Sequence, residues 1–140
     1  MRAYFFTNMY LSPIQCGIQA GHVIGEMAVK YGQNPDSDFL EWANDHKTMI
    51  VLNGGMSCNL ESIINHLSQK ENPYEWDMFI ESQEALYGAL TCVGIVLPEW
   101  VYAKASEVRN ASYNNDLVDV TGVSDWEWEL IKILNSAKLA

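Results

Sequence analysis

Four polar residues fall on one row of a predicted helix, and their spacing suits the binding of a polar ligand. Gln15, Gln19, His22 and Glu26 are separated by four, three and four positions, so a helix would present them on a single face. Amides and a neutral imidazole donate and accept hydrogen bonds without carrying a charge. The row is therefore suited to holding a compact polar molecule, although rows of this kind also often simply face solvent.

Clear start and stop signals define the helix that carries this row. Ser12 is a favourable N-cap, Pro13 suits the first helical position, and Gly32 is expected to take the left-handed conformation after the last turn. A short aromatic segment, residues 2–8, precedes the helix and is predicted to be a β-strand. The helix N-terminus thus follows the carboxyl end of a strand, where α/β proteins place ligands and backbone N–H groups attract anions.

A second row on the same helix consists of glycines. Gly17, Gly21 and Gly25 recur at every fourth position, and each costs about 1 kcal/mol of helix stability relative to alanine. We therefore expect another segment of backbone to pack closely against this face.

The composition indicates one compact and acidic domain. The chain has 140 residues, of which 49% are hydrophobic and 19% charged, and its formal net charge is −10. A chain of this size can bury a substantial core. The negative charge repels polyphosphates at long range, which argues against tRNA as a partner.

The cysteines and the hydropathy pattern exclude several classes of protein. Cys16, Cys58 and Cys92 are an odd number without a Cys-x-x-Cys motif, so we expect buried free thiols, with neither a disulfide framework nor a metal site. No cofactor is predicted. We expect no targeting leader and no membrane span, because no apolar run reaches about 18 residues. The predicted location is the cytoplasm, that of a host cell if the protein is viral.

Strand-like and helix-like segments alternate along most of the chain. Strands are predicted over residues 2–8, 47–53, 76–81 and 89–97, and helices over residues 12–32 and 98–109, after residues 36–38 and after Ser57 or Asn59. This order predicts an α/β fold with a mixed four-stranded sheet and helices on both faces. The apolar run at residues 47–53 predicts a strand buried on both faces, and residues 82–88 are expected to join an antiparallel pair.

The last part of the chain is predicted to be a helical extension, residues 113–140, of an α/β domain formed by residues 1–112. Residues 110–115 are loop-like, residues 117–120 suggest a short strand, and a capping box then opens an amphipathic helix with apolar residues at 126, 130, 133 and 134. This helix must bury its apolar stripe on the domain itself or on a partner subunit. We therefore expect self-association as a dimer or a larger oligomer.

Three local features together point to a known family. Residues 12–23 read Ser-Pro-Ile-Gln-Cys-Gly-Ile-Gln-Ala-Gly-His-Val, Trp42 precedes a predicted strand, and Glu81 is followed after a gap by Thr91. In these features the chain resembles the type II, archaeal and eukaryotic, peptidyl-tRNA hydrolase family, whose first helix opens with Ser-Pro-Gly-Lys-x-Ala-x-Gln-x-x-His-Ala. The resemblance covers about residues 2–110 and implies the α/β fold of that family.

The resemblance also implies roles for particular residues. The Gln-x-x-His pair of the family falls on Gln19 and His22. In an active hydrolase His22 would be the catalytic base, Glu81 would be its partner or orient the attacking water, and Thr91 would supply a hydrogen bond.

Departures from the family pattern argue against hydrolysis. Gln15 stands where the family has a lysine, Ile14 replaces a glycine, and Glu81 stands near the place of an aspartate. A neutral amide stabilises a developing oxyanion less than an ammonium does, and the loss of one such donor lowers a rate by about 10²–10³-fold.

We therefore interpret the chain as a non-catalytic binding protein on a peptidyl-tRNA hydrolase-like fold. The expected site is a cleft framed by hydrogen-bonding groups, namely Asn8, Ser12, Gln15, Gln19, His22 and Thr91. Helix N-terminal amides can hold one phosphate, so a small nucleotide-like molecule is the expected ligand. In one version of this hypothesis a viral protein sequesters a nucleotide signal.

Two alternatives stay open at this point. The first is an active hydrolase of peptidyl-tRNA or a related ester that uses His22 and Glu81. The second is a structural or interaction protein whose interface is the tryptophan-rich helix at residues 126–134.

Overall fold

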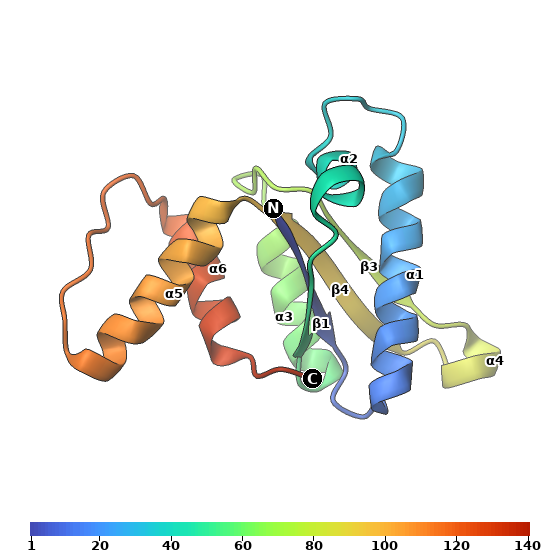
Figure 1. Ribbon diagram of the computed structural model, residues 1–140. Helices are drawn as coiled ribbons and strands as arrows, with labels where there is room; N and C mark the ends of the chain where they lie inside the picture. Colours follow the sequence, from blue (N-terminus) through green and yellow to red (C-terminus); the bar gives the residue numbers. More distant parts are fainter.

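Strands and helices alternate along the chain in a computed structural model that describes all residues from 1 to 140 (Figure 1). The elements are β1 (Arg2–Thr7), α1 (Pro13–Tyr31), α2 (Asp38–Glu41), a π-helix (Trp42–His46), β2 (Met49–Asn53), α3 (Ser57–Leu67), β3 (Trp76–Ile80), α4 (Gln83–Leu86), β4 (Leu90–Leu97), α5 (Glu99–Asn114) and α6 (Asp125–Ser136). None of these helices combines the length and the apolar character needed to cross a bilayer.

The four strands form one mixed sheet in the order β2-β1-β4-β3, which confirms the predicted architecture. β1 pairs with β2 in parallel, whereas β4 runs antiparallel to both β1 and β3. The carboxyl ends of β1, β2 and β3 and the amino end of β4 therefore meet at one edge of the sheet. This edge is where ligands bind in α/β proteins.

The position of β2 at the side of the sheet contradicts one expectation from the sequence. The apolar run at residues 47–53 predicted a strand buried on both faces, but β2 begins at Met49 and only Leu52 is buried. β2 has a full strand partner on one side alone. On its other side it meets only the C-terminal residues, with a bridge between Leu52 and Leu139.

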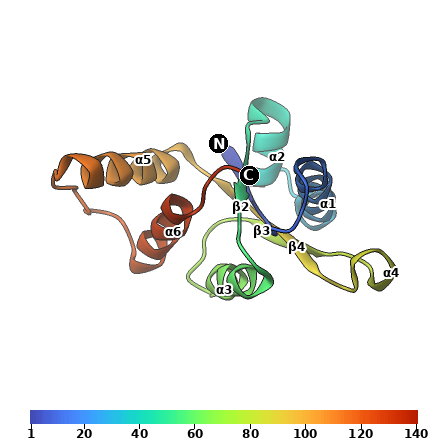
Figure 2. The same cartoon turned by 90° about the horizontal axis from the view of Figure 1, so that it is seen from below.

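Helices cover both faces of the sheet, as predicted (Figure 2). Successive side chains of a strand point to opposite faces, so Phe5 and Phe6, both fully buried, belong to two different core clusters. The cluster of Phe5 includes Val23 of α1 and Trp42 of the π-helix. The cluster of Phe6 includes residues of α3, α5 and α6.

The C-terminal helix packs on the chain's own core. Trp126, Leu130, Ile131 and Leu134 of α6 are buried in the same cluster as Phe6. The capping box of Ser124 and Glu127 is present, as predicted, and the indole ring of Trp126 stacks on the imidazole ring of His66 in α3 at 4.6 Å. The apolar stripe of α6 thus has its partner within the chain.

The segment before α6 differs from its prediction. The loop expected at residues 110–115 is largely helical, because α5 continues to Asn114 across the predicted boundary at residue 112. Residues 117–120 form no strand, and Leu117 is fully exposed. Trp100 of α5 is 43% exposed.

The N-terminus of helix α1 is capped as predicted, but its C-terminus is not. Ser12 and Gln15 form a capping box, whereas Gly32 has a right-handed conformation with φ of −65°. The expected close packing against Gly17, Gly21 and Gly25 is absent, because a Cβ added to any of them would have no neighbour within 4 Å. α1 turns the opposite side, which carries buried residues such as Val23, toward the sheet.

Two smaller expectations also need correction. Met56, not Ser57 or Asn59, is the N-cap residue of α3. All three cysteines are free, and Cys16 and Cys92 are buried as expected, but Cys58 is exposed.

Candidate functional site

Three of the predicted site residues are connected by hydrogen bonds at the carboxyl edge of the sheet. The Nε2 atom of Gln19 donates to Oε2 of Glu81 at 2.9 Å, and the hydroxyl of Thr91 donates to Oε1 of Gln19 at 2.8 Å. Gln19 and Thr91 are both buried. Both polar atoms of the Gln19 side chain are thus used to connect α1 with the ends of β3 and β4.

The carboxylate of Glu81 is held in its ionised form. The hydrogen bond from Gln19 has the largest effect and lowers the pKa of Glu81 below its ordinary value, and the backbone N–H of Ser82 and the nearby His22 lower it further. Glu81 is therefore ionised at neutral pH, so it can accept hydrogen bonds but carries no proton to donate.

His22 lies beside this network without an orienting partner. Its ring stacks on Phe79 with a centroid distance of 4.5 Å and an interplanar angle of 20°. The side chain is exposed, and neither ring nitrogen makes a hydrogen bond within the protein. A catalytic histidine base is usually oriented by a hydrogen bond to its second nitrogen, and that feature is missing here.

The remaining predicted site residues stabilise local backbone. Ser12 and Gln15 cap α1 reciprocally, with the backbone N–H of Ser12 donating to Oε1 of Gln15 at 2.9 Å. Asn8 is buried and donates to Oγ of Ser57 and to the carbonyl of Leu90, at 3.3 and 3.2 Å. Asn8 thereby connects the end of β1 with the start of α3 and of β4.

The structure therefore brings Gln19, His22, Glu81 and Thr91 together at this edge of the sheet. Within this cluster Gln19 binds both Glu81 and Thr91. None of the four residues lines either of the two hollows described below.

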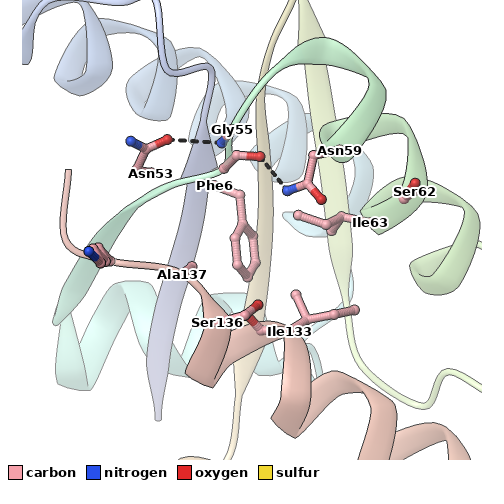
Figure 3. A pocket seen from close by; sticks show the side chains of 11 residues that line it. Phe6, Asn53, Gly55, Asn59, Ser62, Ile63, Ile133, Ser136 and Ala137 are labelled. Carbon is pink, nitrogen blue, oxygen red and sulfur yellow. Dashed lines mark hydrogen bonds between the residues drawn. The ribbon is translucent and has the colours of Figure 1, made fainter.

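A cavity of about 340 Å³ opens instead beside the carboxyl ends of β1 and β2, between α3 and the end of α6 (Figure 3). Apolar side chains contribute to its wall, namely Phe6, Ile63, Ile133 and Ala137. Polar side chains complete the lining, namely Asn53, Asn59, Ser62, Ser136 and Lys138. Lys138 is the only charged residue among them, and its ammonium group forms no ion pair.

Two consecutive glycines shape the loop that bounds this cavity. Gly55 has a φ of +78°, and a Cβ on Gly54 would lie 2.5 Å from Cδ2 of Leu60. Asn53 Oδ1 accepts from the backbone N–H of Gly55 at 2.9 Å, and Nδ2 of Asn59 donates to the carbonyl of Gly54 at 2.6 Å (Figure 3). The loop is thereby fixed before any ligand arrives.

Each of these asparagines keeps one polar atom free. No protein group pairs with Nδ2 of Asn53 or with Oδ1 of Asn59. Both residues line the cavity, and each amide is held by a hydrogen bond on one of its two polar atoms while the other atom stays unpaired. Such a pair can recognise a ligand with both an acceptor and a donor.

Sequence reasoning missed this cavity. The Gly54–Gly55 pair after a strand was the available signal, since consecutive glycines at a strand end often mark a close approach of backbone to a ligand. The other wall comes from residues 133–138, whose position depends on how α6 packs.

No group of three or more His, Cys, Asp or Glu side chains is arranged to hold an ion.

Comparison with known proteins gives no match for this chain, either among protein families or among characterised proteins.

Proposed function

We propose that the protein binds a small nucleotide-like molecule without converting it. The observation that carries this proposal is the preformed cavity at the carboxyl ends of β1 and β2. Its volume of about 340 Å³ lies within the range of ligand sites, about 300–1,000 Å³. Parallel strands of α/β proteins commonly present ligands at this edge.

The residues that line the cavity offer groups suited to the base and to the phosphate of a nucleotide. The free amide atoms of Asn53 and Asn59 suit the donor and acceptor pattern of a base edge, and the apolar wall suits a flat ring. Lys138 can face one phosphate. The resemblance to the peptidyl-tRNA hydrolase family, which acts on the end of a nucleic acid, also supports a ligand of this class.

A binding role is favoured over catalysis because the catalytic residues expected for a hydrolase lack the required arrangement. His22 has no orienting hydrogen bond, and Glu81 is bound to Gln19 and Ser82. In one version of the proposal the protein is viral and sequesters a nucleotide signal, a role that needs tight binding and no turnover. The alternative function, an ester hydrolase that uses His22, is favoured only by the proximity of His22 to the ionised Glu81.

Isothermal titration with nucleoside monophosphates and cyclic nucleotides tests the proposal. We expect at least one of them to bind the wild-type protein, and we expect Ser62→Phe to abolish binding by filling the cavity with a ring. Ser62 is exposed and lines the cavity, so its replacement leaves the core intact.

The matched control is Ser68→Phe. Ser68 is also exposed and follows α3, but it lies outside the cavity. The Ser68→Phe variant should bind the nucleotides with the affinity of the wild type. No heat with any of these ligands, or equal affinity in the Ser62→Phe variant, would contradict the proposal.

A further inference from the structure

Both arginines of the chain line a second hollow. Arg2 and Arg109 are the only arginines in the sequence, and they meet at a hollow of about 280 Å³ between β1, β2, α5 and the C-terminal segment. Ala137 lines this hollow and also the cavity of Figure 3, so the C-terminal segment forms a wall shared by the two.

Aromatic side chains order the guanidinium group of Arg2. Its Cζ atom lies 4.3 Å from the ring centroid of Tyr102, a distance typical of a cation–π contact. The rings of Tyr4 and Tyr102 are 6.4 Å apart. Arg109 follows Tyr102 by seven positions on α5, so the two residues share one face of that helix.

The charge around this hollow is not balanced. The two ion pairs of the protein involve Lys104 and Lys132, so neither arginine has a carboxylate partner. No Asp or Glu lines the hollow, although the chain contains 18 acidic residues. Two unpaired guanidinium groups beside one hollow repel each other, and an anion between them would remove that repulsion.

The hydroxyl of Tyr4 responds to both arginines. Burial raises the pKa of Tyr4, and Arg2 and Arg109 each act in the opposite direction. Tyr4 lines the same hollow as both arginines. The raised pKa keeps the phenol neutral, so it can donate a hydrogen bond to an oxyanion.

We propose that this second hollow binds a small organic oxyanion with an apolar remainder. Arg2 and Arg109 would donate paired N–H bonds to a phosphate monoester or a carboxylate, the two groups that fit the fork of a guanidinium. The apolar remainder would contact Ile50, Leu52 and Leu134, which line the same hollow. This site is separate from the nucleotide cavity and does not depend on it.

Nitrogen-15 NMR of the arginine side chains tests this directly. The wild-type protein has two arginine Nε–H signals, because it has two arginines. The probes are phenyl phosphate, benzoate and the neutral benzyl alcohol. We expect both signals to shift with phenyl phosphate or benzoate and neither to shift with benzyl alcohol. The anion that binds more tightly identifies the group recognised, and signals that move with neither anion overturn the proposal.

Matched substitutions separate a specific site from a general effect of charge. Arg109→Gln should weaken the binding of the anion by about tenfold or more, the loss expected for a charge-assisted hydrogen bond. Lys70→Gln removes the same charge from an exposed residue that lines neither hollow, and it should leave the affinity unchanged. Equal weakening by the two substitutions would overturn the site.

Two further variants keep the outcome interpretable. Arg2→Gln should also weaken binding, which makes the test independent of α5. Ser62→Phe, which fills the nucleotide cavity, should bind phenyl phosphate like the wild type. If Ser62→Phe loses nucleotide binding but still binds phenyl phosphate, the two sites are independent. The failure of one proposal can then be told apart from the failure of the other.

Discussion

The side chain of Gln19 uses both of its polar atoms to join α1 to two strand ends. Its amide nitrogen binds Glu81 and its amide oxygen accepts from Thr91. Because Gln19 and Thr91 are buried, removal of the amide would leave polar atoms without their partners. A polar group that sequence reasoning assigns to a ligand can thus be required for folding.

Replacing Gln19 by methionine should destabilise the protein by about 1–3 kcal/mol, the usual cost of leaving buried polar groups unpaired. Urea unfolding measures this loss. The same substitution at Gln33, which is exposed and makes no side-chain hydrogen bond, should change the stability little. Equal stability of Gln19→Met and the wild type would show that the network contributes nothing.

The same variant should change the acid dependence of folding. The pKa of Glu81 is lower in the folded protein than in the unfolded chain, so its contribution is complete above the ordinary glutamate pKa of about 4.3 and is lost as the pH falls through the folded value. In Gln19→Met the pKa of Glu81, followed by carbon-13 NMR, should rise toward the ordinary value, and this part of the acid sensitivity should decrease.

At the level of single residues, the sequence predicted proximity better than role. The resemblance to the peptidyl-tRNA hydrolase family implied that Gln19, His22, Glu81 and Thr91 would serve one site in a hydrolase, and these residues lie together in the structure. The sequence could not reveal that the side-chain amide of Gln19 binds Glu81 and Thr91. Spacing determines which face a side chain occupies, whereas hydrogen-bond partners depend on distances between separate elements.

Among the elements, α1 loses helix stability at three glycines, and no close packing against them explains this loss. Its three glycines face open space, so alanine at these positions would gain helix stability without a clash. We expect Gly21→Ala to raise the free energy of unfolding by about 0.5–1 kcal/mol, measured by urea denaturation.

Gly94 in β4 is the matched control for this substitution. A Cβ at Gly94 would lie 2.8 Å from Cγ1 of Val23 and 2.9 Å from the ring of Phe5. Gly94→Ala should therefore destabilise the protein by forcing α1 away from the sheet. If Gly21→Ala also destabilised it, the glycine face would have a packing partner after all.

The element boundaries that were wrong share one cause. The apolar run at residues 47–53 reports what a strand can bury, but burial on both faces needs neighbours, and β2 lies at the side of the sheet. Residues 110–115 are polar, yet α5 continues through most of them. Local patterns describe preferences of a segment, and tertiary packing decides where each element ends.

For the whole molecule, the net charge of −10 opposes the binding of long nucleic acids. A polyanion such as tRNA needs several cations in one place, and the protein has eight basic residues against 18 acidic ones. We expect no discharge of peptidyl-tRNA by the purified protein, measured by release of the peptide from labelled substrate.

Two variants complete that experiment. Gln15→Lys introduces the cation of the peptidyl-tRNA hydrolase motif that residues 12–23 resemble, and we expect the variant to remain inactive because His22 is still unoriented. Turnover by the wild type that disappears in His22→Ala would instead support the hydrolase.

The Gly54–Gly55 pair marks one wall of the cavity in the sequence, but the complete cavity could not be predicted from it. One wall follows β2 and the other belongs to residues 133–138, about eighty positions later. Their approach depends on α6 folding back beside α3, which no local pattern encodes. The four-stranded sheet and its two helical layers were predictable because each rests on alternation along the chain.

The short pairing between the C-terminal residues and β2 covers backbone groups at the side of the sheet. Ala140 donates its N–H to the carbonyl of Val51, and Asn53 donates to the carbonyl of Lys138. Without this cover, β2 would offer bare backbone donors and acceptors along an aliphatic sequence, the typical template for fibril growth. We therefore expect these few terminal residues to limit aggregation as well as to form a wall of the cavity.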